Sequence, residues 1–217
     1  MFSRSVIFLS LFFLFFCKDP TPPSPIKPLS VREIKGLVNV KDIDPNLVVD
    51  LRYATEENFT NARVYSFQTC LLRKETAEKI KAANGEFQTF GYRIKIWDGY
   101  RPPYAQRVLW EKVPNPRYVG DPNKGGSVHN RGGAVDLTLV DSSGKELEMP
   151  SAYDDFSMQA SPFRTDLSPK VAENLSLLVR VLTKHGFRQM PSEWWHYNDG
   201  DAKKYPLIDV DPKLWEK

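Results

Sequence analysis

The segment from Ser127 to Val140, which reads SVHNRGGAVDLTLV, constrains the fold of this chain more than any other stretch. It begins with a polar turn that carries His129, and two glycines then lead into an alternating apolar strand that carries Asp136. Successive side chains of a strand point to opposite faces, so these two residues can meet only if the chain turns back between them. Gly132 and Gly133 permit such a turn. The segment therefore predicts one half of a metal site.

The second half is predicted near the end of the chain, where Glu193 precedes His196 by three residues. Two imidazole nitrogens and one carboxylate oxygen form a ligand set that Zn²⁺ accepts, and three protein ligands leave one position for water. We therefore expect His129, Asp136 and His196 to bind one zinc ion per chain, with Glu193 as the base for the metal-activated water. The alternative is that both histidines are ordinary turn and strand residues.

The third histidine, His185, lies at the predicted C-terminal end of a helix, where a cation or a surface imidazole is commonly found. We expect it to lie outside the metal site.

Length and charge point to one catalytic domain without a nucleic-acid partner. The chain has 217 residues, which is enough for one domain and a tail. Its 30 basic residues nearly balance its 27 acidic ones, and no block of like charge suggests a surface for DNA or RNA. Nucleic acid is therefore not expected as a partner, and contact with a membrane is expected only through a lipid anchor.

The N-terminus predicts export. Residues 5–16 form an apolar run that is too short to span a bilayer, and we interpret residues 1–17 as a signal peptide. Cys17 follows a sequence similar to a bacterial lipobox, although Phe16 is bulkier than the usual small residue, so a plain secretory signal is the alternative. Residues 18–30 are rich in proline and predict an extended linker. We expect an extracytoplasmic protein, either a lipoprotein anchored through Cys17 or a periplasmic or secreted protein.

The domain from residue 31 to 217 is predicted to be α+β, with a mostly antiparallel sheet flanked by helices. Alternating or β-branched patterns predict strands over residues 46–53 and 92–97, one ending at Val140, and one from Phe187 to His196. Spacings of three and four residues predict helices from Arg73 to Gly85, over 104–112 with Ala105, Val108 and Leu109 inward, and from Pro169 to about Lys184. Ser168 is expected to cap the start of the last helix, and Gly186 its end. If Cys17 is lipidated, Cys70 has no intramolecular partner.

Five motifs in this order resemble the zinc D-alanyl-D-alanine dipeptidases of the VanX type, which belong to a larger group with the D-Ala-D-Ala carboxypeptidases and share a fold with the hedgehog domain. The motifs are Tyr53-Ala-Thr-x-x-Asn-Phe59, Asp98-Gly-Tyr-Arg-Pro102, Ser127-x-His-x-x-Gly-x-Ala-x-Asp136, Asp154-Asp-Phe-Ser157 and Glu193-Trp-Trp-His-Tyr197. The resemblance covers most of the chain from about Asp50 to Asn198. Asn130 departs from it, because a serine is frequent at this position.

The resemblance implies hydrolysis of the D-alanyl-D-alanine dipeptide, with His129, Asp136 and His196 as zinc ligands and Glu193 as the base. It further implies that Arg101 stabilises the transition state, for which the alternative is a structural ion pair. Ser127 is expected either to bind the substrate carboxylate or to cap its turn. Two other functions stay open: a D,D-carboxypeptidase or endopeptidase acting on peptidoglycan stem peptides, and a zinc-stabilised cell-wall binding module without turnover.

Overall fold

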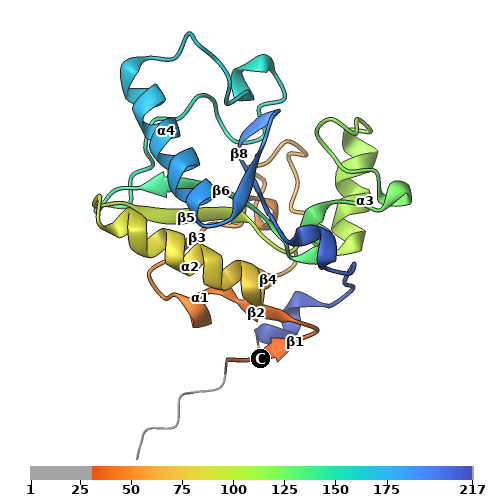
Figure 1. Cartoon of the computed structure of the whole chain (residues 1–217). Coiled ribbons are helices and arrows are strands. Elements are labelled where there is room, and N and C mark those ends of the chain that lie inside the picture. The colour runs from red at the N-terminus through yellow and green to blue at the C-terminus, as the bar shows by residue number, and fades with distance from the viewer. Residues whose placement is uncertain (1–30, 217) are drawn as a thin grey trace, which may run out of the picture. The chain divides into compact units, whose positions relative to one another are not determined.

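The computed structural model describes residues 31–216, so the predicted signal peptide, the lipidation site Cys17 and the proline-rich linker lie outside the described residues. Its central sheet has five strands in the order β3-β5-β6-β8-β7 (Figure 1). Every neighbouring pair is antiparallel except β3 and β5, which confirms the α+β fold with a mostly antiparallel sheet. The strands are β3 (Val48–Val49), β5 (Arg93–Asp98), β6 (Ala134–Val140), β7 (Phe187–Met190) and β8 (Glu193–Asp199).

A second, smaller sheet was not predicted from the sequence. It is antiparallel and consists of β1 (Glu33–Ile34), β2 (Leu37–Asn39) and β4 (Leu71–Arg73). A short helix, α1 (Val40–Ile43), follows β2 directly. Strands of two or three residues are too short for a periodic pattern to identify them.

Three longer helices complete the domain: α2 (Lys74–Gln88), α3 (Pro103–Lys112) and α4 (Pro169–Lys184). In Figure 1, α2 and α4 lie side by side against the central sheet, and α3 lies at the other side of the domain. Helix α4 begins as predicted, because the hydroxyl of Ser168 accepts a hydrogen bond from Val171 N and Pro169 occupies the first turn.

Four local predictions were wrong. The strand predicted over residues 46–53 is reduced to β3, and Arg52–Ala54 form a 3₁₀ turn instead. Helix α2 does not end at Gly85 but continues to Gln88, because the fully buried Phe87 holds its last turn against the core. Val108 on α3 does not point inward but is 36% exposed, since Ala105 and Leu109, four residues apart, define the buried face. The segment from Phe187 to His196 is not one strand but the hairpin of β7 and β8.

The two faces of the central sheet differ in chemistry. Because Ile94 and Ile96 pair with Leu139 and Leu137, these four aliphatic residues lie on one face. The opposite face carries Lys95, Thr138, Asp136 and His196, since Lys95 pairs with Thr138 and Asp136 pairs with His196. A register shift between Ile96 and Asp98 makes a bulge at Trp97 and brings Asp98 opposite Asp136. The sheet thus collects the polar groups on one face.

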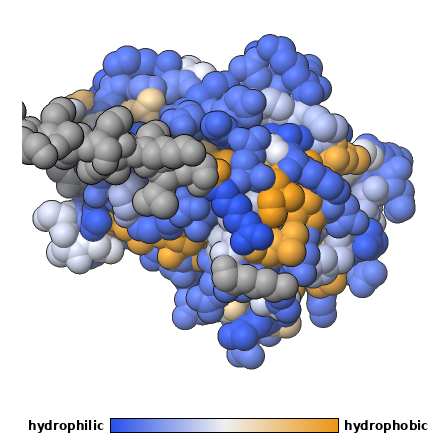
Figure 2. Space-filling model, turned by 90° about the horizontal axis from the view of Figure 1, so that it is seen from below, coloured by the Kyte–Doolittle hydropathy of each residue, from blue (hydrophilic) through white to orange (hydrophobic). Residues whose placement is uncertain are grey.

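The face seen from below is mostly hydrophilic. Figure 2 shows one larger group of hydrophobic residues right of centre on this face, and smaller groups elsewhere among hydrophilic ones. Within residues 31–216, no helix combines the length and the apolar character that crossing a bilayer requires. Cys70 is buried in the core as a free thiol.

Candidate metal centre and active site

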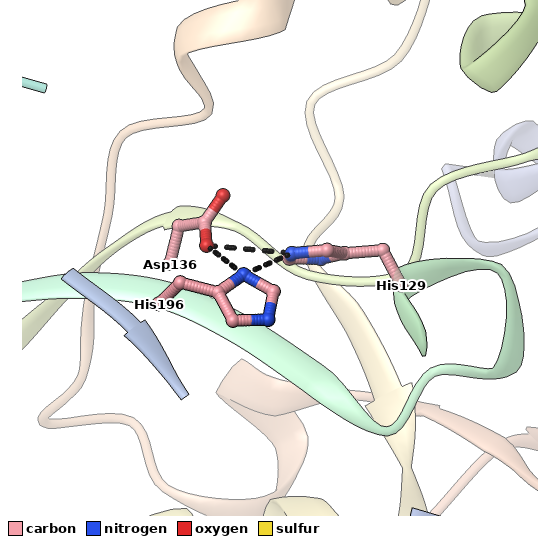
Figure 3. Close-up of side chains that lie close together, drawn as sticks. All are labelled: His129, Asp136 and His196. Atoms are coloured by element: carbon pink, nitrogen blue, oxygen red, sulfur yellow. Dashed lines mark hydrogen bonds and ion pairs between the residues drawn. The ribbon is translucent and has the colours of Figure 1, made fainter. Parts of the chain in front are cut away.

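Three residues predicted as metal ligands lie together although they come from three separate segments. Asp136 on β6 and His196 on β8 are cross-strand partners, and His129 lies on a short 3₁₀ turn before β6. Gly132 ends that turn with a φ of 68°, and a Cβ atom there would lie 2.6 Å from a methyl group of Leu37. The predicted reversal between His129 and Asp136 therefore depends on glycine at this position. Figure 3 shows the three side chains pointing toward one another.

Both imidazoles direct an unprotonated nitrogen to the centre of this group. His129 Nδ1 lies 2.7 Å from the carbonyl oxygen of Gly99, which only accepts, so Nδ1 carries the proton and Nε2 does not. His196 Nε2 lies 3.0 Å from Asn198 Oδ1, and donation to this oxygen leaves Nδ1 unprotonated. Such outer hydrogen bonds orient histidines that bind metals.

The distances within the group fit one metal ion. Asp136 Oδ1 lies 2.9 Å from His196 Nδ1 and 3.3 Å from His129 Nε2, and the two nitrogens are 3.2 Å apart. Ligand atoms at ~2.0–2.1 Å from a tetrahedral zinc ion are ~3.3 Å from one another. Three acceptors at this separation, with no proton between the nitrogens, repel one another unless a cation joins them. Among the described residues, these are the ones that could hold a metal together.

The charge of Asp136 is stabilised although the side chain is buried. Burial opposes its ionisation, but in the absence of a metal the two neighbouring imidazoles, when they carry a proton toward the carboxylate, outweigh burial and hold the pKa of this carboxyl well below its ordinary value. A bound cation would take over this role from the protons. Its second oxygen accepts a hydrogen bond of 3.0 Å from the hydroxyl of Tyr153. The ligand position is therefore negatively charged and fixed in orientation.

Glu193 lies beside this group, with a carboxylate oxygen 3.9 Å from His196 Nδ1. Burial is the main cause that raises its pKa to about 7, and the negative charge of Asp136 adds to it. It lines the same cavity as the three ligand candidates. A carboxyl with this pKa next to a metal site is suited to accept a proton from water.

Arg101 is held in a buried network. Its Nε and Nη2 atoms donate to Asp98 Oδ2 at 3.0 and 2.6 Å, and Nη1 donates to Gln106 Oε1 at 3.0 Å. The guanidinium group has five N–H groups, so two of them remain after these three bonds. Burial opposes its charge, but Asp98 outweighs burial and raises the pKa of Arg101 further. Arg101 thus forms the structural ion pair that was the alternative to a catalytic role. It also lines the cavity, where its remaining N–H groups can meet a substrate.

Ser127 caps the turn that carries His129, because its hydroxyl accepts a hydrogen bond of 3.2 Å from His129 N. The same residue lines the cavity, and its O–H group remains able to donate. Asn130 completes the arrangement: it accepts from Ser127 N at 2.7 Å and donates to the carbonyl oxygen of Arg101 at 2.7 Å. The departure at Asn130 thus connects the backbone of Ser127 to that of Arg101.

The cavity over the ligand group has a volume of about 160 Å³. The rings of Tyr118 and Phe156, 4.9 Å apart, lie on its wall, and Trp195 also lines it. The cavity is small in comparison with typical ligand pockets of ~300–1,000 Å³.

Asp154 also lines the cavity, although no role was predicted for it from the sequence. It adopts a φ of 60°, which is uncommon outside glycine, and it accepts hydrogen bonds from Tyr53 Oη at 3.2 Å and Phe59 N at 3.4 Å. Burial, followed by the charge of Asp136, raises its pKa to about 7. Its place in a motif shared with known dipeptidases was the available signal, but the motif alone did not show that the carboxyl enters the cavity.

His185 lies outside this site, as expected. Its Nε2 atom is 2.8 Å from Glu86 Oε2, in an ion pair between the end of α4 and α2.

Comparison with known proteins places these residues in a family. The chain matches the D-ala-D-ala dipeptidase family over residues 33–212. It is 36% identical to the D-alanyl-D-alanine dipeptidase of Escherichia coli K12, over 79% of this chain and 89% of that protein. It is 32% identical to the D-alanyl-D-alanine dipeptidase of Enterococcus faecium, over 68% and 83%. A mutant of the vancomycin-resistance D,D-pentapeptidase VanY in complex with Zn(II) aligns with a TM-score of 0.41 and 15% identity, over 64% of this chain and 80% of that one.

Proposed function

The chain belongs to the D-Ala-D-Ala dipeptidase family, and from this premise we propose that it hydrolyses the free D-alanyl-D-alanine dipeptide with one zinc ion per chain. The observation that carries this proposal is the small cavity in which the His-Asp-His group, Glu193, Arg101 and Asp154 meet. When bound by the His-Asp-His group, zinc supplies a positive charge that acidifies water and polarises a carbonyl group.

The protein's own residues then perform the proton transfers. Glu193 takes a proton from the attacking water and delivers it to the amine that leaves, which is the ordinary sequence for a carboxyl base of raised pKa. The two N–H groups of Arg101 that remain after its bonds to Asp98 and Gln106 stabilise the oxygen on which negative charge develops. Because the network is buried, the guanidinium group needs no reorganisation during the reaction.

Recognition of a dipeptide requires a group for each of its charged ends. Asp154 is the buried carboxyl that fits the free ammonium group, and the hydroxyl of Ser127 fits the carboxylate. A buried carboxylate that loses its cationic partner carries a large cost, so a substrate whose amine is blocked should bind poorly. Size points the same way as charge: a cavity of about 160 Å³ has room for a dipeptide but not for a stem peptide.

The test is a side-by-side incubation of the purified protein with D-Ala-D-Ala, with N-acetyl-D-Ala-D-Ala and with a pentapeptide stem. We expect release of D-alanine from the free dipeptide, and at least a hundredfold lower kcat/KM for the other two. In Asp154→Asn the preference for the free amine over the acetylated one should shrink, while the zinc content stays at one per chain. Equal cleavage of the pentapeptide by the wild type would assign the chain to the carboxypeptidases instead.

We further propose that the enzyme acts outside the cytoplasm, anchored through a lipidated Cys17. The support is the apolar run before this cysteine and the proline-rich linker after it. A single acyl chain binds membranes only marginally, whereas the several chains of a bacterial lipoprotein give stable attachment at ~0.8 kcal/mol per buried CH₂. Fractionation of cells that express the wild type and Cys17→Ser tests this proposal.

A further inference from the structure

Four buried polar atoms of side chains have no hydrogen-bond partner among the described residues, and all four belong to residues that line one cavity. They are Arg52 Nε, Trp97 Nε1, Thr138 Oγ1 and Glu146 Oε1. More than ~90% of buried polar groups in proteins are hydrogen-bonded, so four exceptions in one place require a common explanation. A ligand with matching polar groups would explain all four together.

This cavity is separate from the candidate active site. It has a volume of about 260 Å³ and shares no lining residue with the cavity over the His-Asp-His group. Thr138 lies on the same face of the central sheet as Asp136, two residues further along β6. Tyr153 stands between the two places, because it lines the second cavity and its hydroxyl donates to Asp136 Oδ2.

Three of the four residues present hydrogen-bond donors that suit a carboxylate. Arg52 uses Nη1 for Glu57 at 2.5 Å and holds Nη2 at 3.3 Å from Asp50, which leaves the N–H group at Nε. The indole N–H of Trp97 is a donor only, and the hydroxyl of Thr138 can donate. Trp97 and Thr138 are only 3% and 1% exposed, so an unpaired polar atom on either side chain is costly and a ligand that pairs it is favoured.

The same cavity presents a carboxylate, next to Arg52, that suits an ammonium group. Glu146 Oε1 lies 2.9 Å from Lys95 Nζ and 3.5 Å from Arg52 Nη2, so it is ion-paired, and a carboxylate oxygen beside these cations can still accept one further hydrogen bond. Two cations, Arg52 and Lys95, stand beside three carboxylates, Asp50, Glu57 and Glu146, which leaves one negative charge in excess. A ligand that is only an anion is therefore not favoured, and a ligand with both charges is.

We infer that this cavity is a second binding site, for a small zwitterionic amino acid. The carboxylate of the ligand accepts from Arg52 Nε, Trp97 Nε1 and Thr138 Oγ1, and its ammonium group donates to Glu146 Oε1. The inference rests on the groups of this cavity and does not depend on the proposed hydrolysis.

Two tryptophans allow the two cavities to be followed separately by NMR. The indole N–H of Trp97 reports on the second cavity, and that of Trp195 reports on the active-site cavity. The zinc-loaded full chain is titrated with D-alanine and with glycine, and Trp97→Phe assigns the signal. We expect a saturable shift of the Trp97 signal. The signal of Trp110, which lines neither cavity, should stay in place.

Three variants and one half-ligand, acetate, decide the outcome. Thr138→Val keeps the shape of the side chain and removes the hydroxyl. The affinity measured at the Trp97 signal should therefore fall at least tenfold, while kcat/KM for the dipeptide is unchanged. Thr138→Ser, which keeps the hydroxyl, should bind as the wild type does. Glu146→Gln should weaken the binding of D-alanine but not that of acetate. If the Trp97 signal does not move up to ~100 mM ligand, or if Thr138→Val has no effect, the cavity holds only water. If acetate binds as tightly as D-alanine, the zwitterion assignment is wrong.

Discussion

Replacement of Arg101 by alanine tests the most specific part of the proposed mechanism, because it should produce two separate losses. The first is catalytic: removal of one group that stabilises the developing negative charge lowers kcat by ~10²–10³, or ~3–4 kcal/mol. The second concerns stability. Asp98 is fully buried and would lose the cation that donates twice to its Oδ2 atom.

The magnitude of the stability loss follows from the remaining contacts of Asp98. Breaking a buried ion pair from one side costs ~3–5 kcal/mol. Asp98 Oδ1 keeps its hydrogen bonds from Tyr65 Oη at 2.7 Å and from Gly99 N at 2.9 Å, so we expect the lower end of that range. Urea denaturation measures this loss, and kcat must be measured at a temperature where the variant is fully folded.

Two further variants separate the contributions. Arg117→Ala removes an exposed arginine that also lines the cavity, and it should leave kcat within a factor of ~3. Arg101→Lys keeps the charge but cannot serve Asp98, Gln106 and the substrate together, so kcat should stay well below that of the wild type. If Arg101→Ala raises KM and leaves kcat unchanged, the arginine binds the substrate carboxylate and does not stabilise the transition state.

The remaining predictions concern the base, the metal, the buried thiol and the anchor. Glu193→Gln should keep its zinc, as measured by elemental analysis, but its kcat should fall by a factor of ~10²–10⁴. The base acts in its deprotonated form, and a bound cation lowers its pKa from about 7, so the activity of the wild type should fall on acidification below pH 7. Asp136→Ala should lose the zinc and the activity together, whereas His185→Ala, paired with Glu86, should keep both. Burial raises the pKa of Cys70, so this thiol should resist iodoacetamide at pH 8 until urea unfolds the chain. Above pH ~8.5 the thiol ionises in the unfolded chain but not in the folded one, so the free energy of unfolding should decrease there. Cys17→Ser should release the enzyme from the membrane fraction with its hydrolytic activity intact, and equal solubility of both forms would leave a plain secretory signal.

The parts of the fold that were predictable have a regular pattern with clear ends. Helix α4 was predicted from Pro169 to about Lys184 because Ser168, Pro169 and Gly186 mark its two ends, and the structure confirms these bounds. Strand β5 was predicted to within one residue from its alternation. The two strands of β1 and β2 were not found, because two or three residues do not show a period.

The site was predictable where chemistry and spacing agree. Two histidines and an aspartate, each on a segment with a distinct turn or strand pattern, were grouped from the sequence, and the structure places their ligand atoms within 4.8 Å of one another. What no pattern gives is the choice of nitrogen on each imidazole. This choice depends on Gly99 O and Asn198 Oδ1, acceptors that only the folded chain brings beside the rings.

Two local irregularities explain why the remaining groups of the site were not found from the sequence. Strict alternation along β5 puts Asp98 on the aliphatic face with Ile94 and Ile96, but the bulge at Trp97 turns it to the face of Asp136. Asp154 enters the active-site cavity from a left-handed backbone conformation with a φ of 60°. Backbone of this kind costs ~1–3 kcal/mol and persists where surrounding contacts hold it, here the hydrogen bonds from Tyr53 and Phe59. In Asp154→Gly this strain is relieved, but the hydrogen bonds from Tyr53 and Phe59 are lost with the carboxyl and glycine favours the unfolded chain. Urea denaturation should therefore show no gain in stability, while the preference for the free amine over the acetylated dipeptide falls; an unchanged preference would show that Asp154 only holds the loop.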